Sequence, residues 1–356
     1  MNSPKIFTVG PTYVNDDVRA AMSHQMFSHR SADYVELHRD LIEKLRKFLD
    51  TKNDIFLYTS SSTGCMESSV RNMISEGGTA LSMICGAFGK RFSEIVEENG
   101  RKVITTSVEW GQANRGEELD GVLSKNPNIE AVTITHCETS TSLLNPLDEL
   151  CKVANEHGVL TIVDTVSSMA GVKIDVDKLG IDFCFFGVQK CFAIPPGLAV
   201  ATVSKKALEK AESVKNRGHY FDFLNLKKSN DNQMVPYTPP MPQMFGLSKQ
   251  LDLIFEEGIE NRFERHNKVS ARVRNGCKDL GFSVFPVEKY ASPTLSAISV
   301  PEGFDIKGML AKMKKRGFIL ASGYGKIKDT TFRVGNMGNV TMDDVCEMLE
   351  NLEEII

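Results

Sequence analysis

The chain has 356 residues, of which 41% are hydrophobic and 25% charged, and its formal net charge is −4. This length allows a large core and two domains, and the weakly acidic balance argues against a protein that binds nucleic acid or an anionic membrane surface. No stretch approaches membrane-spanning length, and Met1–Lys5 does not open a signal peptide. The eight scattered cysteines show no CxxC pair and no zinc spacing, so we expect reduced thiols, no metal and a cytoplasmic location.

Seven short apolar or β-branched runs recur along the first two thirds of the chain, separated by segments of helical length. They are Ile55–Thr59, Ala80–Ile84, Val103–Thr106, Ala131–Thr135, Val159–Asp164, Phe183–Gly187 and Leu198–Val203. Strands that alternate with helices need crossover connections. The pattern therefore predicts an α/β fold with a mainly parallel seven-stranded sheet.

Helical segments follow several of these runs. The segment Cys65–Ser75 comes after the first run, and Leu147–His157 carries the expected punctuation, with Pro146 near its start and Gly158 just past its end. Proline is favoured at the first turn of a helix and glycine directly after the last. Both segments are therefore predicted as helices that cover the sheet.

A proline-rich stretch at residues 236–242 ends the alternation. A long helical segment then runs from about residue 244 to 280, with an interruption near Gly258, and the rest reads as strand, helix, strand, strand, helix. We therefore predict a large domain over residues 1–258 and a smaller α+β domain over residues 259–356. The N-terminal arm could pack on either domain.

Two of the predicted strands end in opposite charges. Asp164 closes the run Val159–Asp164, and Lys190 follows the run Phe183–Gly187. An ammonium group at the exit of a buried strand is costly unless it is paired or used chemically. Pyridoxal phosphate requires such a pair, an acid to hold its pyridinium nitrogen and a lysine to form a Schiff base. An ordinary Asp–Lys ion pair explains these two residues equally well.

The stretch Ser60–Gly64 lies between the first predicted strand and the helix that follows it. A turn of serine, threonine and glycine that opens a helix offers free N–H groups, hydroxyl donors and the positive end of the helix dipole, which together bind anions. Such residues also cap helices that bind nothing. In an open α/β sheet, ligands bind outside the carboxyl ends of the strands, and this turn would share that edge with Asp164 and Lys190.

Further candidates follow other strands. Phe88 could stack on a flat ring, although most aromatic residues at such positions belong to the core. His136, Cys137 and Glu138 could bind a metal, but three consecutive residues do not easily converge on one ion. Arg333 interrupts an apolar strand of the small domain, where it could clamp a carboxylate with two hydrogen bonds or lie at a surface edge.

Collinear motifs along nearly the whole chain resemble those of class V, fold-type I pyridoxal-phosphate aminotransferases, the group with alanine–glyoxylate, serine–pyruvate and archaeal aspartate transaminases. The matching pieces are Val9–Thr12, Ser28–Ser31, Gly86–Arg91, Thr135–Asn145, Val163–Ser168, Gln189–Lys190, Pro195–Gly197, Tyr237–Pro239, Glu257–Arg262 and Phe332–Gly338. The resemblance implies a transaminase that moves the amino group of a small amino acid to glyoxylate or pyruvate.

The resemblance also implies roles around the cofactor ring. Lys190 would form the Schiff base and relay the proton, and Asp164 would keep the pyridine nitrogen protonated. Val166 would pack against one face of the ring and Phe88 would stack on the other. Thr139 would lie near the phenolic oxygen.

For the phosphate and the substrate, the resemblance implies a second set of residues. Ser61, Ser62 and Thr63 would bind the phosphate with help from the Gln189 side chain. Thr238 would reach the phosphate of a neighbouring subunit, which implies a homodimer with shared active sites. Arg333 would hold the α-carboxylate of the substrate.

The sequence departs from the family pattern at two places. Ser60 and Ser62 replace the two glycines of a phosphate turn that usually reads Gly-Ser-Gly-Thr, and Phe88 stands where relatives often have tryptophan. Serine fits only where the backbone avoids torsion angles reserved for glycine. Neither change removes a chemical role.

Other functions on the same fold remain as alternatives. A 2-aminoethylphosphonate–pyruvate transaminase shares the motif around His136, but Gln189-Lys190 and the strand around Arg333 follow the alanine–glyoxylate pattern. A cysteine desulfurase needs a cysteine on a mobile loop, whereas Cys277 and Cys346 fall in helical patterns. A non-catalytic or hydrogenase-associated homologue would be expected to lose Lys190 or Asp164.

Overall fold

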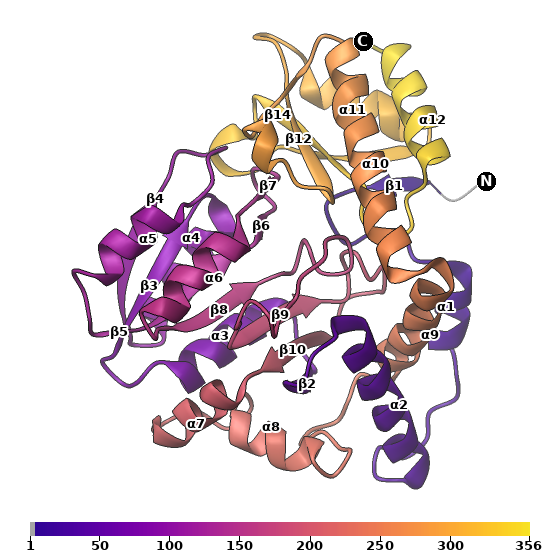
Figure 1. The fold of residues 1–356 in the computed structure, drawn as a ribbon. Helices are drawn as coiled ribbons and strands as arrows, with labels where there is room; N and C mark the ends of the chain where they lie inside the picture. The colour runs from indigo at the N-terminus through magenta and orange to yellow at the C-terminus, as the bar shows by residue number, and fades with distance from the viewer. Residues whose placement is uncertain (1–3) are drawn as a thin grey trace.

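A seven-stranded sheet forms the centre of the larger part of the computed structural model, which describes residues 4–356 (Figure 1). Its strands are β2 (Asp54–Tyr58), β3 (Thr79–Ile84), β4 (Lys102–Ser107), β5 (Ile129–Thr135), β8 (Leu160–Asp164), β9 (Phe183–Gly187) and β10 (Ala199–Val203). They lie in the order β2-β10-β9-β8-β5-β3-β4. Only β10 runs antiparallel to its neighbours. The predicted α/β fold with a mainly parallel sheet is confirmed.

Helices cover both faces of this sheet. Successive side chains of a strand point to opposite faces, so each strand contributes to a core on either side. On β2, Phe56 and Tyr58 enter one core and Ile55 and Leu57 enter the other. The first core includes residues of α3 (Ser62–Met73), α4 (Ala87–Glu98), α7 (Lys205–Ser213) and α8 (Phe223–Asn230). The second includes residues of α2 (Ala32–Leu49), α5 (Gly116–Leu123), α6 (Leu147–Glu156) and α9 (Met241–Glu257). The sheet is thus the middle of three layers.

A smaller five-stranded sheet lies above the first in Figure 1. Its strands are β1 (Lys5–Phe7), β11 (Ser283–Val284), β12 (Leu295–Ser299), β13 (Phe318–Ser322) and β14 (Thr331–Gly335). A third core joins it to α10 (Ile259–Asp279), α11 (Ile306–Lys315) and α12 (Met342–Glu353). Short 3-10 helices, η1 (Glu288–Tyr290) and η2 (Gly325–Ile327), lie between the strands. The predicted order of strand, helix, strand, strand, helix holds for the last five long elements.

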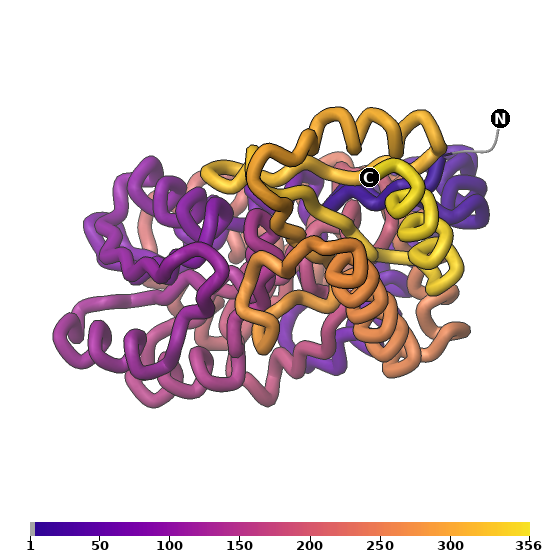
Figure 2. Tube along the Cα trace, turned by 90° about the horizontal axis from the view of Figure 1, so that it is seen from above, coloured from indigo at the N-terminus to yellow at the C-terminus, as the bar shows by residue number. Residues whose placement is uncertain are grey.

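The N-terminal arm reaches both parts of the molecule. Strand β1 pairs in parallel with β13, with Lys5 opposite Phe318, and Lys5 Nζ lies 2.8 Å from Asp344 Oδ1 on α12. Helix α1 (Asp16–Met22) then packs on α9. Figure 2 shows this indigo segment beside the yellow C-terminal helix. The sequence left the place of the arm open, and the boundary at residue 258 stays a prediction.

Gly258 separates α9 from α10, as predicted, and has a φ of +86° that favours glycine. Helix α3 begins at Ser62, three residues before the predicted start at Cys65. Ser61 has the extended backbone of an N-cap, so Ser62 and Thr63 belong to the first helical turn. Among residues 4–356, no helix combines the length and the apolar character that crossing a membrane requires.

Candidate active site

The predicted site residues meet at one edge of the large sheet. Strands β2, β8 and β9 all run toward this edge, since β10 is antiparallel to both β2 and β9. Asp164 is the last residue of β8, Lys190 follows β9, and the first turn of α3 follows β2. Chain segments far apart in sequence therefore deliver a carboxylate, an amine and a helix N-terminus to one place.

Asp164 is 4% exposed and is held by a single backbone donor. Its Oδ1 accepts a hydrogen bond from the Val166 N–H at 2.8 Å, which leaves Oδ2 for another donor. Burial raises the pKa of Asp164 to about 7, and the Val166 N–H and the positive charge of Lys190 oppose this rise. A cation at Oδ2 would restore the carboxylate form.

Lys190 is held by the N-terminal arm. Its Nζ donates to the Val9 carbonyl, and its own carbonyl accepts from Thr12 Oγ1 at 3.0 Å. A Cβ on Gly10, which has a φ of +108°, would overlap the Lys190 side chain. Burial, together with the nearby Arg333 guanidinium, lowers the pKa of Lys190 to about 8. The amine therefore loses its proton far more easily than an exposed lysine does.

The first turn of α3 has the features of a candidate anion site. Ser61 is its N-cap without a side-chain hydrogen bond, and the buried Ser62 Oγ has no partner among the described residues. Gly187, at the end of β9, packs so closely that a Cβ there would overlap both Ser62 Oγ and Gln189 Oε1. The backbone of Thr63 lies in the same turn. The free N–H groups of this turn, the Ser62 hydroxyl and the Gln189 amide thus lie close together, an arrangement that favours binding of an anion.

Thr139 and Thr238 have partners within this chain. Thr139 is buried, and its Oγ1 forms a hydrogen bond with Ser167 Oγ just beyond β8. The Thr238 carbonyl accepts from Thr59 Oγ1 at 3.2 Å, one residue before the turn that leads into α3. The structure thus places the Thr238 carbonyl against the residue that precedes the turn Ser60–Gly64 of its own chain.

Phe88 lies in the first turn of α4 and is half-buried. Its ring stacks on Tyr324, with centroids 5.9 Å apart and planes 26° apart, and the Arg91 guanidinium lies 4.8 Å from its centroid. The sequence predicts a stacking role for Phe88 and a loop near Gly323–Lys326 at the substrate entrance, but it does not place Tyr324 against Phe88. That contact joins a helix of the large part to a loop of the small sheet.

Arg333 is 7% exposed, which rules out the surface-edge alternative. Its Nε donates to the Ser322 carbonyl at 2.9 Å and its Nη1 to the Thr139 carbonyl at 3.0 Å. Within residues 4–356, no carboxylate lies at ion-pair distance from it. Burial lowers its pKa to about 10. A buried guanidinium with a free Nη2 favours binding of an anion.

His136, Cys137 and Glu138 serve separate structural partners. Glu138 accepts hydrogen bonds from the N–H groups of Phe88 at 2.9 Å and Gly89 at 3.1 Å. It therefore caps the first turn of α4, the turn that carries the Phe88 ring. His136 Nδ1 lies 2.9 Å from Ser168 Oγ, and Cys137 contacts Ser292. The part of the chain that the structure describes holds no cluster of three such ligands. Sequence reasoning weighed Glu138 only as a metal ligand and missed its capping role.

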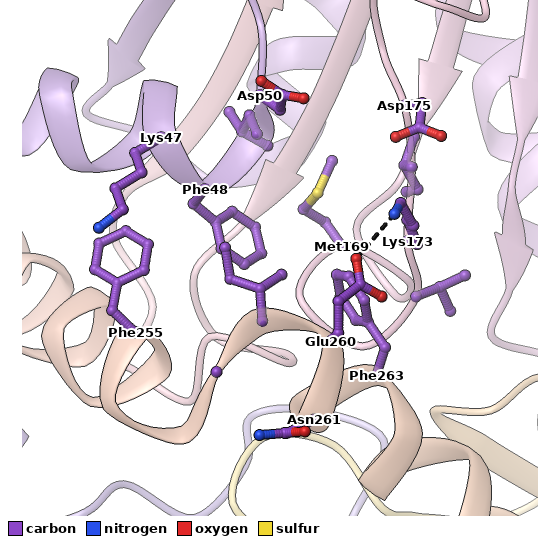
Figure 3. A pocket seen from close by; sticks show the side chains of 15 residues that line it. Lys47, Phe48, Asp50, Met169, Lys173, Asp175, Phe255, Glu260, Asn261 and Phe263 are labelled. Atoms are coloured by element: carbon purple, nitrogen blue, oxygen red, sulfur yellow. Dashed lines mark hydrogen bonds and ion pairs between the residues drawn. The ribbon is translucent and has the colours of Figure 1, made fainter.

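A cavity of about 570 Å³ lies away from these side chains (Figure 3). It opens between the end of α2, the loop after β8 and the junction of α9 with α10. Figure 3 shows Phe48, Met169, Phe255 and Phe263 around it, with an ion pair of 2.8 Å between Lys173 and Glu260. None of the predicted site residues lines this cavity. The convergence of charged groups, rather than hollow volume, defines the candidate active site.

Comparison with known proteins identifies the family. The sequence matches the family described as Aminotransferase class-V over residues 14–327. It is 40% identical to an uncharacterized aminotransferase of Methanocaldococcus jannaschii, over 92% of this chain and 86% of that protein. It is 34% identical to the serine–glyoxylate aminotransferase of Hyphomicrobium methylovorum, over 94% and 85%.

Solved structures agree. The alanine–glyoxylate aminotransferase of Nostoc sp. has a TM-score of 0.94 to this chain at 28% identity, covering 99% of this chain and 95% of that one. The fold is thus that of fold-type I pyridoxal-phosphate aminotransferases. The chain belongs to the class V aminotransferases and is a transaminase that depends on pyridoxal phosphate.

Proposed function

We propose that this transaminase moves the amino group of a small amino acid, such as alanine, serine or aspartate, to glyoxylate or pyruvate. The observation that carries the proposal is the buried Arg333, which has no carboxylate partner among the described residues and lowers the pKa of Lys190 through its charge. An α-carboxylate at Arg333 would bring the α-carbon of an amino acid toward the Lys190 amine.

The residues present fit pyridoxal phosphate. The unpaired Ser62 hydroxyl, the N-terminus of α3 and the Gln189 amide match a phosphate, and the free Oδ2 of Asp164 matches a pyridinium N–H. Lys190, with its pKa lowered to about 8, would supply a neutral amine for the carbonyl of the cofactor. When bound, the cofactor supplies an electron sink for the bonds at the substrate α-carbon.

Lys190 can then act as the acid and base of the reaction. A pKa of about 8 would let its amine take a proton from the substrate α-carbon and pass it on to the bound cofactor near neutral pH. Arg333 would hold the α-carboxylate and so set the direction of the Cα–H bond. Phe88, whose N–H is fixed by Glu138, would cover the ring face and keep water away.

The choice of substrates rests on the relatives. Matching proteins are named as serine–glyoxylate aminotransferase, in Methylorubrum extorquens among others, and as L-aspartate–glyoxylate aminotransferase, in Paracoccus denitrificans. These names share an oxo acid and differ in the donor. We therefore infer glyoxylate or pyruvate as the acceptor, and a donor from the same small set.

The other functions have less support. One relative is named as a soluble hydrogenase 42 kDa subunit in Anabaena cylindrica, but this chain retains Lys190 and Asp164. Cys277 lies buried in α10 and Cys346 lies in α12, so neither occupies the loop position that a desulfurase needs. No observation favours the phosphonate substrate.

Two measurements test the proposal. Borohydride reduction of the purified protein, followed by peptide mapping, should place the pyridoxyl group on Lys190, and Lys190→Ala should retain the cofactor without turnover. A single-turnover screen that follows the absorbance of the bound cofactor should show a reaction with alanine, serine or aspartate. A label on another lysine, or no reaction with any of these donors, would falsify the proposal.

A further inference from the structure

Residues 323–328, which include η2 and form most of the connection between β13 and β14, make a short loop that we call the clasp. Its base is tight, since the Gly323 N–H donates to the Thr331 carbonyl at 2.9 Å and Thr331 Oγ1 donates to the Ile327 carbonyl at 2.6 Å. These bonds anchor the base of the loop to the strands beside it. One of these strands, β14, carries Arg333.

The clasp touches the large part of the molecule at two aromatic rings. Tyr324 stacks on Phe88, and Lys326 Nζ lies 4.9 Å from the centroid of Trp110, which follows β4. Between them, Gly325 approaches so closely that a Cβ would lie 2.8 Å from Trp110 Cη2. Arg91 Nη2 also donates to the Tyr324 hydroxyl at 3.4 Å. These contacts join the small sheet to the helix that carries Phe88.

Tyr324 also lies against Arg333. The guanidinium carbon is 5.5 Å from the centroid of the Tyr324 ring, within the range of a cation–π contact. Arg333 Nε is bound to the carbonyl of Ser322, two residues before Tyr324. The ring of Tyr324 thus contacts both Phe88 and Arg333. Even with these contacts Tyr324 is 37% exposed, so the core does not require it.

We propose that Tyr324 is a positioning residue for Arg333, and that the clasp closes the substrate site against Phe88 and Trp110. This inference rests on the proposed function, in which Arg333 holds the α-carboxylate of every donor. When the clasp is seated, Tyr324 fixes the plane of the guanidinium and shields it from water. When the clasp lifts, Arg333 loses the ring, and the carboxylate loses its orientation.

Donor kinetics test the link between the two residues. Tyr324→Ala should lower kcat/KM by roughly 3- to 30-fold with alanine, serine and aspartate alike, because a cation–π contact is lost. Tyr324→Phe, which keeps the ring, should stay within about twofold of the wild type. Neither change should weaken cofactor binding, measured from its absorbance.

A double-mutant cycle separates positioning from a general structural role. In an Arg333→Lys background, Tyr324→Ala should cost less than about twofold, because the guanidinium that it positions is gone. Losses that multiply in the double variant would overturn the inference. A wild type that transaminates none of the three donors would instead sink the proposed function.

Fluorescence tests the clasp without any turnover, since Trp110 is the single tryptophan of the chain. In the protein with bound cofactor, Tyr324→Ala and Lys326→Ala should shift the Trp110 emission to longer wavelength, because water reaches the indole. Lys328→Ala is the matched control, an exposed lysine of the same loop that contacts no aromatic ring. Identical spectra for all of these proteins would show that the clasp is not seated on Trp110.

Discussion

At the scale of single residues, one physical cause shifts Lys190 and Asp164 in opposite directions. Burial disfavours charge, so it lowers the pKa of Lys190 to about 8 and raises that of Asp164 to about 7. Each group is therefore close to losing its charge near neutral pH. A cofactor that brings a positive ring nitrogen to Asp164 and a carbonyl to Lys190 would use both shifts.

The lowered pKa of Lys190 predicts how the apoenzyme takes up its cofactor. The neutral amine attacks the cofactor carbonyl, and at pH 7 about 10% of a lysine with a pKa near 8 is neutral, against about 0.03% of an ordinary one. The rate of covalent uptake, followed by absorbance, should therefore rise with pH up to about 8 and then level off. A rate that keeps rising to pH 10 would mean that Lys190 titrates as an exposed lysine.

Asp164→Asn separates the electronic role of this residue from its structural one. The amide keeps the shape but cannot balance a pyridinium charge, so we expect turnover to fall by about 10²- to 10³-fold.

In the apoenzyme, the raised pKa of Asp164 makes the stability of the fold depend on pH. Between about pH 4 and pH 7 only the folded chain holds this proton, so the stability of the apoenzyme falls as the pH rises.

At pH 8, apo Asp164→Asn should accordingly unfold at a higher temperature than the apo wild type, which has to bury a charge. Thermal unfolding of both apo forms measures this difference. Near-normal turnover together with a lower melting temperature would make Asp164 a structural anion only.

At the scale of elements, the start of α10 fixes the loops of the active site. Arg262 is fully buried, and its Nη2 donates to the Cys191 carbonyl at 2.6 Å while its Nε donates to the Ala170 carbonyl at 3.0 Å. Glu257, at the end of α9, pairs with Arg262 Nη1 at 2.8 Å. One side chain thus binds the residue after Lys190 and the loop after β8.

Arg262→Gln should therefore lower the free energy of unfolding by about 2–5 kcal/mol, because two buried carbonyls lose their donor. Lys268→Gln is the control on the same helix. Its pair with Glu264 is exposed and screened by solvent, so its loss should leave the free energy of unfolding nearly unchanged. Urea unfolding of the protein with bound cofactor compares the two, and equal losses would show that the Arg262 contacts add no stability.

Local patterns predict the elements well and the contacts between them poorly. Apolar runs place all seven strands of the large sheet to within two residues, because buried strands have few alternatives. The start of α3 is predicted too late because serine and threonine are common both in turns and in first helical turns. Strand β1 has three residues and no pattern of its own.

In the candidate site, too, local patterns predict single residues and miss the contacts between distant segments. Asp164, Lys190 and the Ser/Thr turn are predictable, since each ends a strand or opens a helix at the sheet edge. The capping by Glu138 and the stack of Tyr324 on Phe88 join residues 50 and 236 positions apart in sequence. No local signal announces such contacts.

At the scale of the whole molecule, Thr238 raises the question of which subunit it serves. Its carbonyl contacts Thr59, just before the turn that leads into α3 of its own chain, whereas the family resemblance assigns Thr238 to the site of a partner. Thr238→Ala should weaken cofactor binding under either assignment. Mixed dimers of one Thr238→Ala subunit and one Lys190→Ala subunit distinguish the two assignments.

If Thr238 acts across a homodimer, a mixed dimer contains one site with both residues intact, and cofactor affinity there returns to the wild-type value. If it acts within its own chain, every site that retains Lys190 lacks Thr238. Cofactor affinity at the sites that retain Lys190, measured from their Schiff-base absorbance in the refolded subunits, would then stay low in all mixtures.

The pairing of β1 with β13 bears on how the protein is made. The first strand leaves the ribosome long before its partner, Phe318–Ser322, has been synthesised. At ordinary translation rates this interval lasts roughly 15 to 65 s. Throughout it, Lys5–Phe7 presents unpaired backbone groups of the kind that recruit strands from other chains. Val9, which holds Lys190, sits two residues further on, so in newly made chains the strand beside this contact stays unpaired until Phe318–Ser322 has been synthesised.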